Sequence, residues 1–257
     1  MTRQFRPEVV QVGTDLNALA GSYLHTVIRR DWQACRTCAL PVQGYPHCPQ
    51  CSTHLHSHLP LADRVGLLVY ADKPASQAYR TMYGYKEPRL REQYEPVMRA
   101  LLAVGLRAHF ACASALAGTT DSGWAVVPST KGREVLANLV RGLSRNPDSE
   151  VRVAYGGVVP NRGLNPDSWS VESDQRMPGH VMIIDDAWVT GSSAQSLAVA
   201  LKQAGAGQVS ILTVARVLSA EWNHNRLFIG TILPTLPYDW TTCPWTGREC
   251  PEPLGNR

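Results

Sequence analysis

Short apolar runs alternate with longer segments of helical periodicity along most of the chain. The apolar runs are typical of buried strands, and they occupy residues 64–71, 124–128, 181–184 and 209–215. The helical repeats lie between them or follow them, at residues 94–117, at residues 134–143 and after Ser192. Strands that alternate with helices predict a mostly parallel sheet flanked by helices on both faces, and therefore an α/β fold.

Three other segments have weaker patterns. Residues 151–159 (VRVAYGGVV) favour one more strand, whereas residues 161–178 are rich in Pro, Gly, Asn and Ser and are typical of a long surface loop. The chain from Pro234 onward is rich in proline and predicts an irregular tail.

The N-terminal region predicts an amphipathic first helix. Apolar residues recur at helical spacing from Leu16 to Ile28, after Thr14 and Asp15, which are suitable residues to cap a helix. We expect its apolar face to pack on the rest of the protein, and binding to a partner is the alternative.

Composition narrows the class of protein. With 257 residues, 44% hydrophobic and 18% charged, the chain is globular and long enough for one sizeable core plus a small module. The net charge of +4 favours anionic ligands mildly and is too small to indicate nucleic acid by itself. We find no apolar run of about 18 residues and no signal-peptide core near the N-terminus, so we expect no membrane span and a cytoplasmic location.

Four cysteines form a compact metal-binding pattern. Cys35, Cys38, Cys48 and Cys51 are spaced as C-x2-C-x9-C-x2-C. Each close pair can hold one side of a tetrahedral ion, and four thiolates leave no open coordination position. We therefore predict a structural zinc ribbon, with an iron–sulfur cluster as the main rival because it takes the same ligands.

The remaining cysteines and the nearby histidines give no such pattern. His47, His54, His56 and His58 crowd the ribbon, and we expect solvated side chains rather than a histidine in place of one cysteine. Cys112 is most simply a small buried residue. Cys243 and Cys250 form a looser pair, which favours unligated thiols or a packing role over a second metal site.

An acidic pair follows the strand at residues 181–184. Asp185 and Asp186 are expected at the carboxyl edge of the sheet, where open α/β folds bind ligands. A turn then leads into a helix. The small side chains and backbone amides of this turn are suited to binding a phosphate, and its residues are Thr190, Gly191, Ser192 and Ser193. The loop is neither a P-loop nor a dinucleotide fingerprint. Acids just before a phosphate site fit a ribose 5-phosphate.

This stretch, MIIDDAWVTGSSAQS, resembles the signature by which type I phosphoribosyltransferases bind phosphoribosyl pyrophosphate (PRPP). Together with the four-cysteine ribbon, it makes the chain similar to the ComF-type, competence-associated members of that family. The resemblance implies a type I phosphoribosyltransferase fold. It also implies that Asp185 and Asp186 hold the ribose hydroxyls and the magnesium environment, while residues 190–193 bind the 5-phosphate.

Two further segments are similar to the family. VVPSTKGRE implies pyrophosphate contacts from Lys131 and Arg133, and positive charge there would stabilise the leaving pyrophosphate. RGLNPDSWSV brings in Arg162, Asn165 and Trp169 as an acceptor or lid element. Two departures are visible: Trp188 replaces a smaller aliphatic residue and would narrow the site or stack on a ligand, and EVLANLVRGL replaces a more basic run.

The resemblance divides the chain into four parts. These are an N-terminal amphipathic helix (1–31), the zinc ribbon (32–60), a phosphoribosyltransferase domain (61–233) and a proline-rich tail (234–257). The implied activity is transfer of a phosphoribosyl group from PRPP with magnesium to an unidentified acceptor, with release of pyrophosphate. The alternative is a non-enzymatic regulatory or nucleic-acid-associated protein, for which single-stranded DNA is the candidate partner, although the ribbon is poor in basic and aromatic residues.

Overall fold

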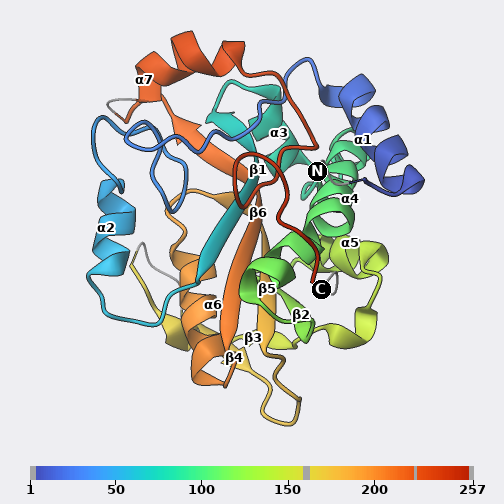
Figure 1. The fold of residues 1–257 in the computed structure, drawn as a ribbon, viewed down its shortest axis with the longest axis vertical. Coiled ribbons are helices and arrows are strands. Elements are labelled where there is room, and N and C mark those ends of the chain that lie inside the picture. The colour runs from blue at the N-terminus through green and yellow to red at the C-terminus, as the bar shows by residue number, and fades with distance from the viewer. Residues whose placement is uncertain (1–3, 159–162, 223–224, 255–257) are drawn as a thin grey trace.

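A parallel sheet forms the centre of the molecule. The computed structural model describes residues 4–158, 163–222 and 225–254, and within them the sheet has the strand order β1-β6-β5-β2 (Figure 1). Its strands are β1 (Arg64–Lys73), β2 (Ser122–Val126), β5 (His180–Trp188) and β6 (Gln208–Ser219). The predicted α/β class, with a parallel sheet flanked by helices, is confirmed.

Helices cover both faces of this sheet. One face carries α3 (Gln77–Gly84), α4 (Arg91–Ala117) and α5 (Val135–Leu143), with α1 (Pro7–Ala20) packed on α4. The other face carries α6 (Ser192–Gln203) and α2 (Pro49–Leu55), which belongs to the cysteine ribbon (Figure 1). The short elements are η1 (Pro147–Ser149), β3 (Val153–Tyr155), η2 (Pro166–Ser168), β4 (Trp169–Val171), α7 (Asn225–Leu227), η3 (Phe228–Ile232) and η4 (Leu233–Thr235).

Strand β5 shows how the sheet separates two apolar cores. Met182 and Ile184 belong to the core under α4, whereas Val181 and Ile183 belong to the core under α6. This alternation follows from the two-residue period of a strand, and it explains why a strand buried on both faces reads as a continuous apolar run.

The first helix begins and ends earlier than predicted. It starts at Pro7 and ends at Ala20, so Thr14 lies inside it and donates to the Val10 carbonyl instead of capping it. Proline favours the first turn because it has no amide hydrogen to leave unpaired. Its buried residues are Val9, Gly13, Leu16 and Ala20. Beyond the helix, the predicted periodicity belongs to an extended segment, in which Thr26 pairs with Val69 of β1.

Helix α4 corrects one expectation. Its 27 residues are long and apolar enough to cross a membrane, contrary to the expectation that no segment comes near that limit. About 56% of its most apolar window is buried within the fold. Leu101, Leu102 and Met98 are fully enclosed between the sheet and the neighbouring helices. Helix α4 is therefore the core helix of a folded domain, which accounts for its apolar composition.

The segment expected to be a long surface loop contains regular structure. Residues 169–171 form β4, which pairs antiparallel with β3 in a small separate hairpin. The predicted strand at residues 151–159 is correspondingly shortened to Val153–Tyr155 among the residues described. Trp169 is buried against α6, so the segment is held on the fold.

The C-terminal tail is irregular, as predicted, but it is part of the core. Tyr238, Cys243 and Trp245 are buried in the same cluster as α4. The Trp240 ring lies so close to Gly13 of α1 that an added Cβ would come within 2.2 Å of it, and Trp245 similarly covers Gly66 of β1. In Figure 1 the red tail accordingly runs alongside α4.

Candidate functional site

The acidic pair lies at the carboxyl-terminal part of β5. Strand β2 stops pairing at Ile184, but β5 continues beside β6, and Asp185 stands opposite Thr213. The pair therefore lies within β5, near its carboxyl end, rather than after the strand. Because Asp185 and Asp186 follow each other in a strand, their side chains leave it in opposite directions.

Asp186 is held by two donors from the segment after α3. It is 6% exposed, accepts a hydrogen bond of 2.8 Å from the Tyr85 hydroxyl, and forms an ion pair with the Lys86 ammonium group. Burial and the negative charge of Asp186 raise the pKa of Tyr85 well above its usual value, so its proton remains in place to donate.

Asp185 has fewer hydrogen-bond partners than Asp186, and its negative charge is disfavoured by its surroundings. One of its oxygens accepts from the backbone amide of Asp186 at 2.9 Å. Burial, together with the Asp186 charge, raises the pKa of Asp185 to about 7, while the Lys86 charge opposes that shift. A carboxyl group that changes its charge near neutral pH is typical of a functional site, although structural ion pairs also perturb pKa values.

A turn with a left-handed glycine joins this strand to α6. Gly191, the N-cap residue of α6, has φ +79°, and an added Cβ would lie 2.1 Å from the Trp188 ring. Gly191 has no side chain to bond the first amides of the helix, and the Ser192 amide donates instead to the Thr190 hydroxyl at 3.3 Å. Thr190 donates to the Ser192 hydroxyl at 3.1 Å. The predicted phosphate-binding residues therefore surround the N-terminus of α6, where the helix dipole favours an anion.

Trp188 lies beneath this turn. It is 1% exposed, and its ring lies against Gly191 at the start of α6. That it narrows the site or stacks on a ligand stays a prediction. Its carbonyl and that of Val189 accept hydrogen bonds from the buried Arg216 guanidinium group, at 2.8 and 3.2 Å. Trp188 supports the turn. Its ring occupies the space where a Cβ of residue 191 would lie, so only glycine fits at that position.

The predicted pyrophosphate loop is at the same edge of the sheet. It follows β2, and the Val127 amide donates to the Ile184 carbonyl at 3.0 Å, one residue before Asp185. Lys131 and Arg133 are both exposed, and Gly132 between them has φ +65°. Arg133 pairs with Glu87 at 3.0 Å, next to the Lys86 that pairs with Asp186. The fold thus brings two basic segments to the acidic pair.

The predicted acceptor or lid residues are only partly described. Arg162 lies outside the described residues. Asn165 donates its backbone amide to the Ser196 hydroxyl of α6 at 2.8 Å, and Trp169 donates its indole NH to the Ser193 carbonyl at 3.1 Å. This segment is therefore anchored to the first turns of α6, beside the phosphate-binding turn.

The four ribbon cysteines form a compact group. All are buried, and their sulfur atoms lie within 4.8 Å of one another. The Cys38 and Cys48 sulfur atoms are 3.7 Å apart. A tetrahedral zinc ion with Zn–S bonds of about 2.3 Å places its ligands about 3.8 Å apart, so the group fits such an ion.

The ribbon packs directly on the candidate site. His54 of α2 is buried, and its Nε2 lies 3.3 Å from the Ser192 hydroxyl. This corrects the expectation of a solvated side chain for His54, whereas His56 and His58 are exposed as expected. A cavity of about 230 Å³ lies between the ribbon and the turn, lined by Cys38, Cys48, Trp188 and Thr190 among others. The ribbon is therefore a support for the turn.

A second group of metal-binding side chains is present. It contains His109, Cys112, Cys243 and Cys250, whose ligand atoms also lie within 4.8 Å of one another. Among the residues that the structure describes, two groups could therefore bind a metal such as zinc. The sequence favoured unligated thiols or a packing role for Cys243 and Cys250 over a second metal site, and it did not connect them with His109 and Cys112.

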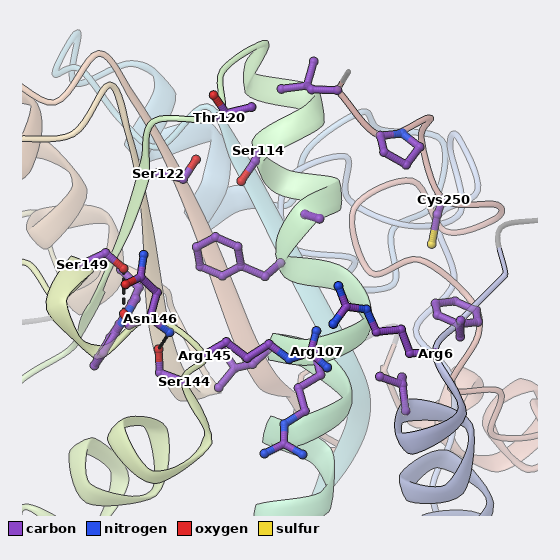
Figure 2. A pocket seen from close by; sticks show the side chains of 18 of the residues that line it. Arg6, Arg107, Ser114, Thr120, Ser122, Ser144, Arg145, Asn146, Ser149 and Cys250 are labelled. Atoms are coloured by element: carbon purple, nitrogen blue, oxygen red, sulfur yellow. Dashed lines mark hydrogen bonds between the residues drawn. The ribbon is translucent and has the colours of Figure 1, made fainter. Parts of the chain in front are cut away.

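A larger groove than the cavity beside the ribbon lies elsewhere (Figure 2). It has a volume of about 1200 Å³ and is lined from α4, the α5–η1 segment and the tail, with Arg6, Arg107 and Arg145 along it. Ser122, at the amino end of β2, is at its border, and that residue pairs with His180 at the start of β5. From His180 to Asp185 the strand rises roughly 16 Å. The groove is therefore separate from the acidic pair.

The sequence pattern did not identify Tyr85, Lys86 or His54. Tyr85 and Lys86 follow a helix rather than a strand. The rule that ligands of α/β sheets bind at the carboxyl ends of strands therefore does not identify them. Only the packing of α3 against β1 and β6 brings them to Asp186.

Comparison with known proteins finds no protein family that matches the chain and no curated protein that is similar to it.

Proposed function

We propose that the protein binds PRPP at the carboxyl edge of the sheet and transfers its phosphoribosyl group to an acceptor that carries a nitrogen nucleophile. The observation that carries this proposal is the succession of Asp185 and Asp186 at the end of β5, the turn at Gly191 and the N-terminus of α6. Acidic and amide groups in this order suit a sugar that has vicinal hydroxyls near a phosphate.

Each residue has a distinct part in the proposed reaction. The amides and hydroxyls of residues 190–193 bind the 5-phosphate, and the acidic pair orients the ribose hydroxyls. Lys131 and Arg133 stabilise charge on the pyrophosphate as its bond to the sugar C1 breaks and the acceptor nitrogen bonds to that carbon. Arg133 must exchange its Glu87 partner for the ligand, since the two are paired.

Magnesium would accompany PRPP. Its oxygen-rich coordination suits carboxylates and pyrophosphate, and it would neutralise charge on the leaving group. Lys86 already pairs with Asp186, so we propose that the Asp185 carboxylate contacts the magnesium ion. The β3–β4 segment, anchored to α6 through Asn165 and Trp169, borders the space for the acceptor.

Calorimetric titration with PRPP tests the proposal. We expect magnesium-dependent binding to the zinc-loaded protein, and at least a hundredfold weaker binding in the Asp185→Asn/Asp186→Asn double variant, because hydrogen bonds to charged groups contribute about 1.5–3 kcal/mol each. The matched control is Asp121→Asn, since Asp121 pairs with Arg176 near the start of β2.

Four outcomes decide among an intact binding site, its absence, transfer and binding alone. A double variant that binds PRPP as wild type does would remove the acidic pair from the site. A well-folded wild type that does not bind PRPP would contradict the whole proposal. PRPP-dependent pyrophosphate release that disappears in Asp186→Asn would support transfer, and binding without release on any nitrogen acceptor would reduce the function to nucleotide sensing.

One observation favours a second candidate function, association with nucleic acid. The groove in Figure 2 carries Arg6, Arg107 and Arg145, together with the aromatic residues Phe5 and Phe110. Positive charge beside aromatic rings suits single-stranded DNA, and binding should weaken steeply with salt. The absence of binding at low salt would exclude this function, and an unchanged salt slope in Arg107→Ala/Arg145→Ala would exclude the groove.

A further inference from the structure

The seven cysteines of the chain separate into two groups. Four belong to the ribbon, and the remaining three meet one histidine on the opposite side of the sheet. His109 and Cys112 lie one turn apart on the same side of α4, whereas Cys243 and Cys250 come from the tail. Figure 2 shows Cys250 beside α4. The odd number of cysteines is thereby explained, because a histidine completes the second set.

The spacing within the second group matches a metal site. The Nδ1 atom of His109 lies 3.5 Å from the Cys250 sulfur and 4.0 Å from the Cys112 sulfur. For Zn–S bonds of about 2.3 Å and Zn–N bonds of about 2.0 Å, a tetrahedron requires about 3.5 Å between nitrogen and sulfur ligands. Small movements of the Cys112 side chain would complete that geometry.

The histidine has its other nitrogen fixed by the tail. Nε2 of His109 lies 3.0 Å from the Trp240 carbonyl, so it must donate its proton there. In the neutral imidazole that a metal requires, Nδ1 is then the unprotonated nitrogen, and it is the one that faces the sulfurs. Metal-binding histidines almost always donate their second ring nitrogen in this way.

The tail forms a tight loop between its two cysteines. The Gly247 amide donates to the Cys243 carbonyl at 2.8 Å, and the Cys243 amide donates to the Arg248 carbonyl at the same distance. Gly247 has φ +72°, which favours glycine. These bonds close the loop and bring Cys250 back to Cys243.

A positive charge lies beside the group. Arg29 packs under Gly247 and donates to the Pro244 carbonyl at 3.1 Å. It also interacts electrostatically with Cys243 and with the ribbon cysteines Cys35 and Cys38. A zinc ion with three thiolates carries a net negative charge, and a guanidinium group at this position would offset it.

We propose that His109, Cys112, Cys243 and Cys250 form a second, structural zinc site that fixes the C-terminal tail to α4. Four protein ligands close the coordination sphere, so the site has no position for a substrate. The bound ion holds the tail against the domain, where Trp240 covers α1 and Trp245 covers β1. The tail is therefore a metal-fastened part of the fold.

Metal stoichiometry tests the proposal. We expect two zinc ions per wild-type chain by elemental analysis, and one in Cys243→Ser/Cys250→Ser. The variant Cys250→His, which keeps a ligand, should retain two. The matched control is His25→Gln: His25 also contacts the tail, at the Leu236 carbonyl, but lies outside the group, so this variant should retain two ions.

X-ray absorption of the wild type keeps the proposal testable if the cysteine variants do not fold. We expect seven sulfur ligands and one nitrogen ligand for two zinc ions, because the groups contain seven cysteines and one histidine. One ion per chain with sulfur ligands only would overturn the proposal. A disulfide between Cys243 and Cys250, detected by mass spectrometry without reductant, would overturn it as well.

Discussion

The two cysteine groups differ in how they are assembled along the chain. The ribbon group draws its four ligands from residues 35–51, whereas the second group spans residues 109–250. The ribbon group lies against the turn at Trp188 and Thr190, and the second group joins α4 to the tail. The ribbon group is thus near the candidate ligand site, and the second group connects a core helix to the C-terminal tail.

This difference predicts different consequences of metal loss. Within the ribbon, few apolar residues are available, so the metal must supply most of the folding energy of that module. At the second group, helix α4 is already packed by the sheet, and only the tail depends on the metal. Loss of the first should therefore affect the ligand site, and loss of the second should affect mainly stability.

The largest expected effect comes from the ribbon. Cys48→Ser/Cys51→Ser should lose one zinc ion and, with it, PRPP binding, because the ribbon contributes His54 and the wall behind Trp188. Cys243→Ser/Cys250→Ser should lower the midpoint of urea unfolding but retain PRPP binding. Calorimetry and urea titration on both variants measure the two effects.

Reversal of this pattern would refute the division of roles. If the ribbon variant binds PRPP normally, the ribbon is only an attached module. If the tail variant alone loses PRPP binding, the second group is coupled to the site through β1 or α4.

The same contrast explains what the sequence could predict. The ribbon, β1 and the stripe of Ala194, Leu197, Ala198 and Leu201 on α6 are local patterns, and the structure has them as expected. The second group is not local, because Cys112 and Cys243 are separated by most of the domain. No spacing rule connects them before the fold is known.

The candidate site is predictable to the same extent. The acids and the Gly191 turn follow one another in the chain, so their proximity follows from the strand-turn-helix pattern. Lys86 reaches Asp186 only through the packing of α3, a tertiary contact that no local periodicity encodes. The burial of Trp188 likewise depends on a tertiary contact, because it packs in the same core as the ribbon cysteines.

A smaller effect is expected from Gly191→Ala, which tests the contact between turn and ribbon. The new methyl group would lie 2.1 Å from the Trp188 ring, and φ +79° is unfavourable for alanine. We expect a loss of about 2 to 4 kcal/mol in the free energy of unfolding, from overpacking and backbone strain. PRPP binding should also weaken, since the Trp188 ring must move and displace the turn.

Gly142→Ala is the matched control for that variant. Gly142 lies in α5, and nothing is within 4 Å of the position of an added Cβ. Alanine there should stabilise the helix by up to about 1 kcal/mol. Equal stability of the Gly191→Ala variant and wild type would show that Trp188 can move freely, and that the ribbon does not hold the turn.

The smallest expected effect concerns the charge of Asp185. Its folded pKa of about 7 lies above the usual value of about 4 for an unfolded chain, so its contribution to stability is complete below pH 4 and is lost as the pH rises through 7. The groups that face it electrostatically are Asp186 and Lys86. Asparagine at position 185 does not ionise, so the Asp185→Asn variant does not undergo this loss of stability as the pH rises. Relative to wild type, this variant should therefore gain about 1 to 2 kcal/mol between pH 5.5 and pH 8, a value reduced for partial exposure.

Urea unfolding at both pH values, with zinc held constant, measures this gain. Asp121→Asn is the control, because the Arg176 guanidinium lowers the pKa of Asp121, and the resulting stability is lost only when the pH falls below about 4. Its difference from wild type should therefore be the same at both pH values. If Asp185→Asn behaves like this control, Asp185 is already ionised without cost at pH 5.5. The electrostatic strain that we associate with ligand binding at this edge would then be absent from Asp185.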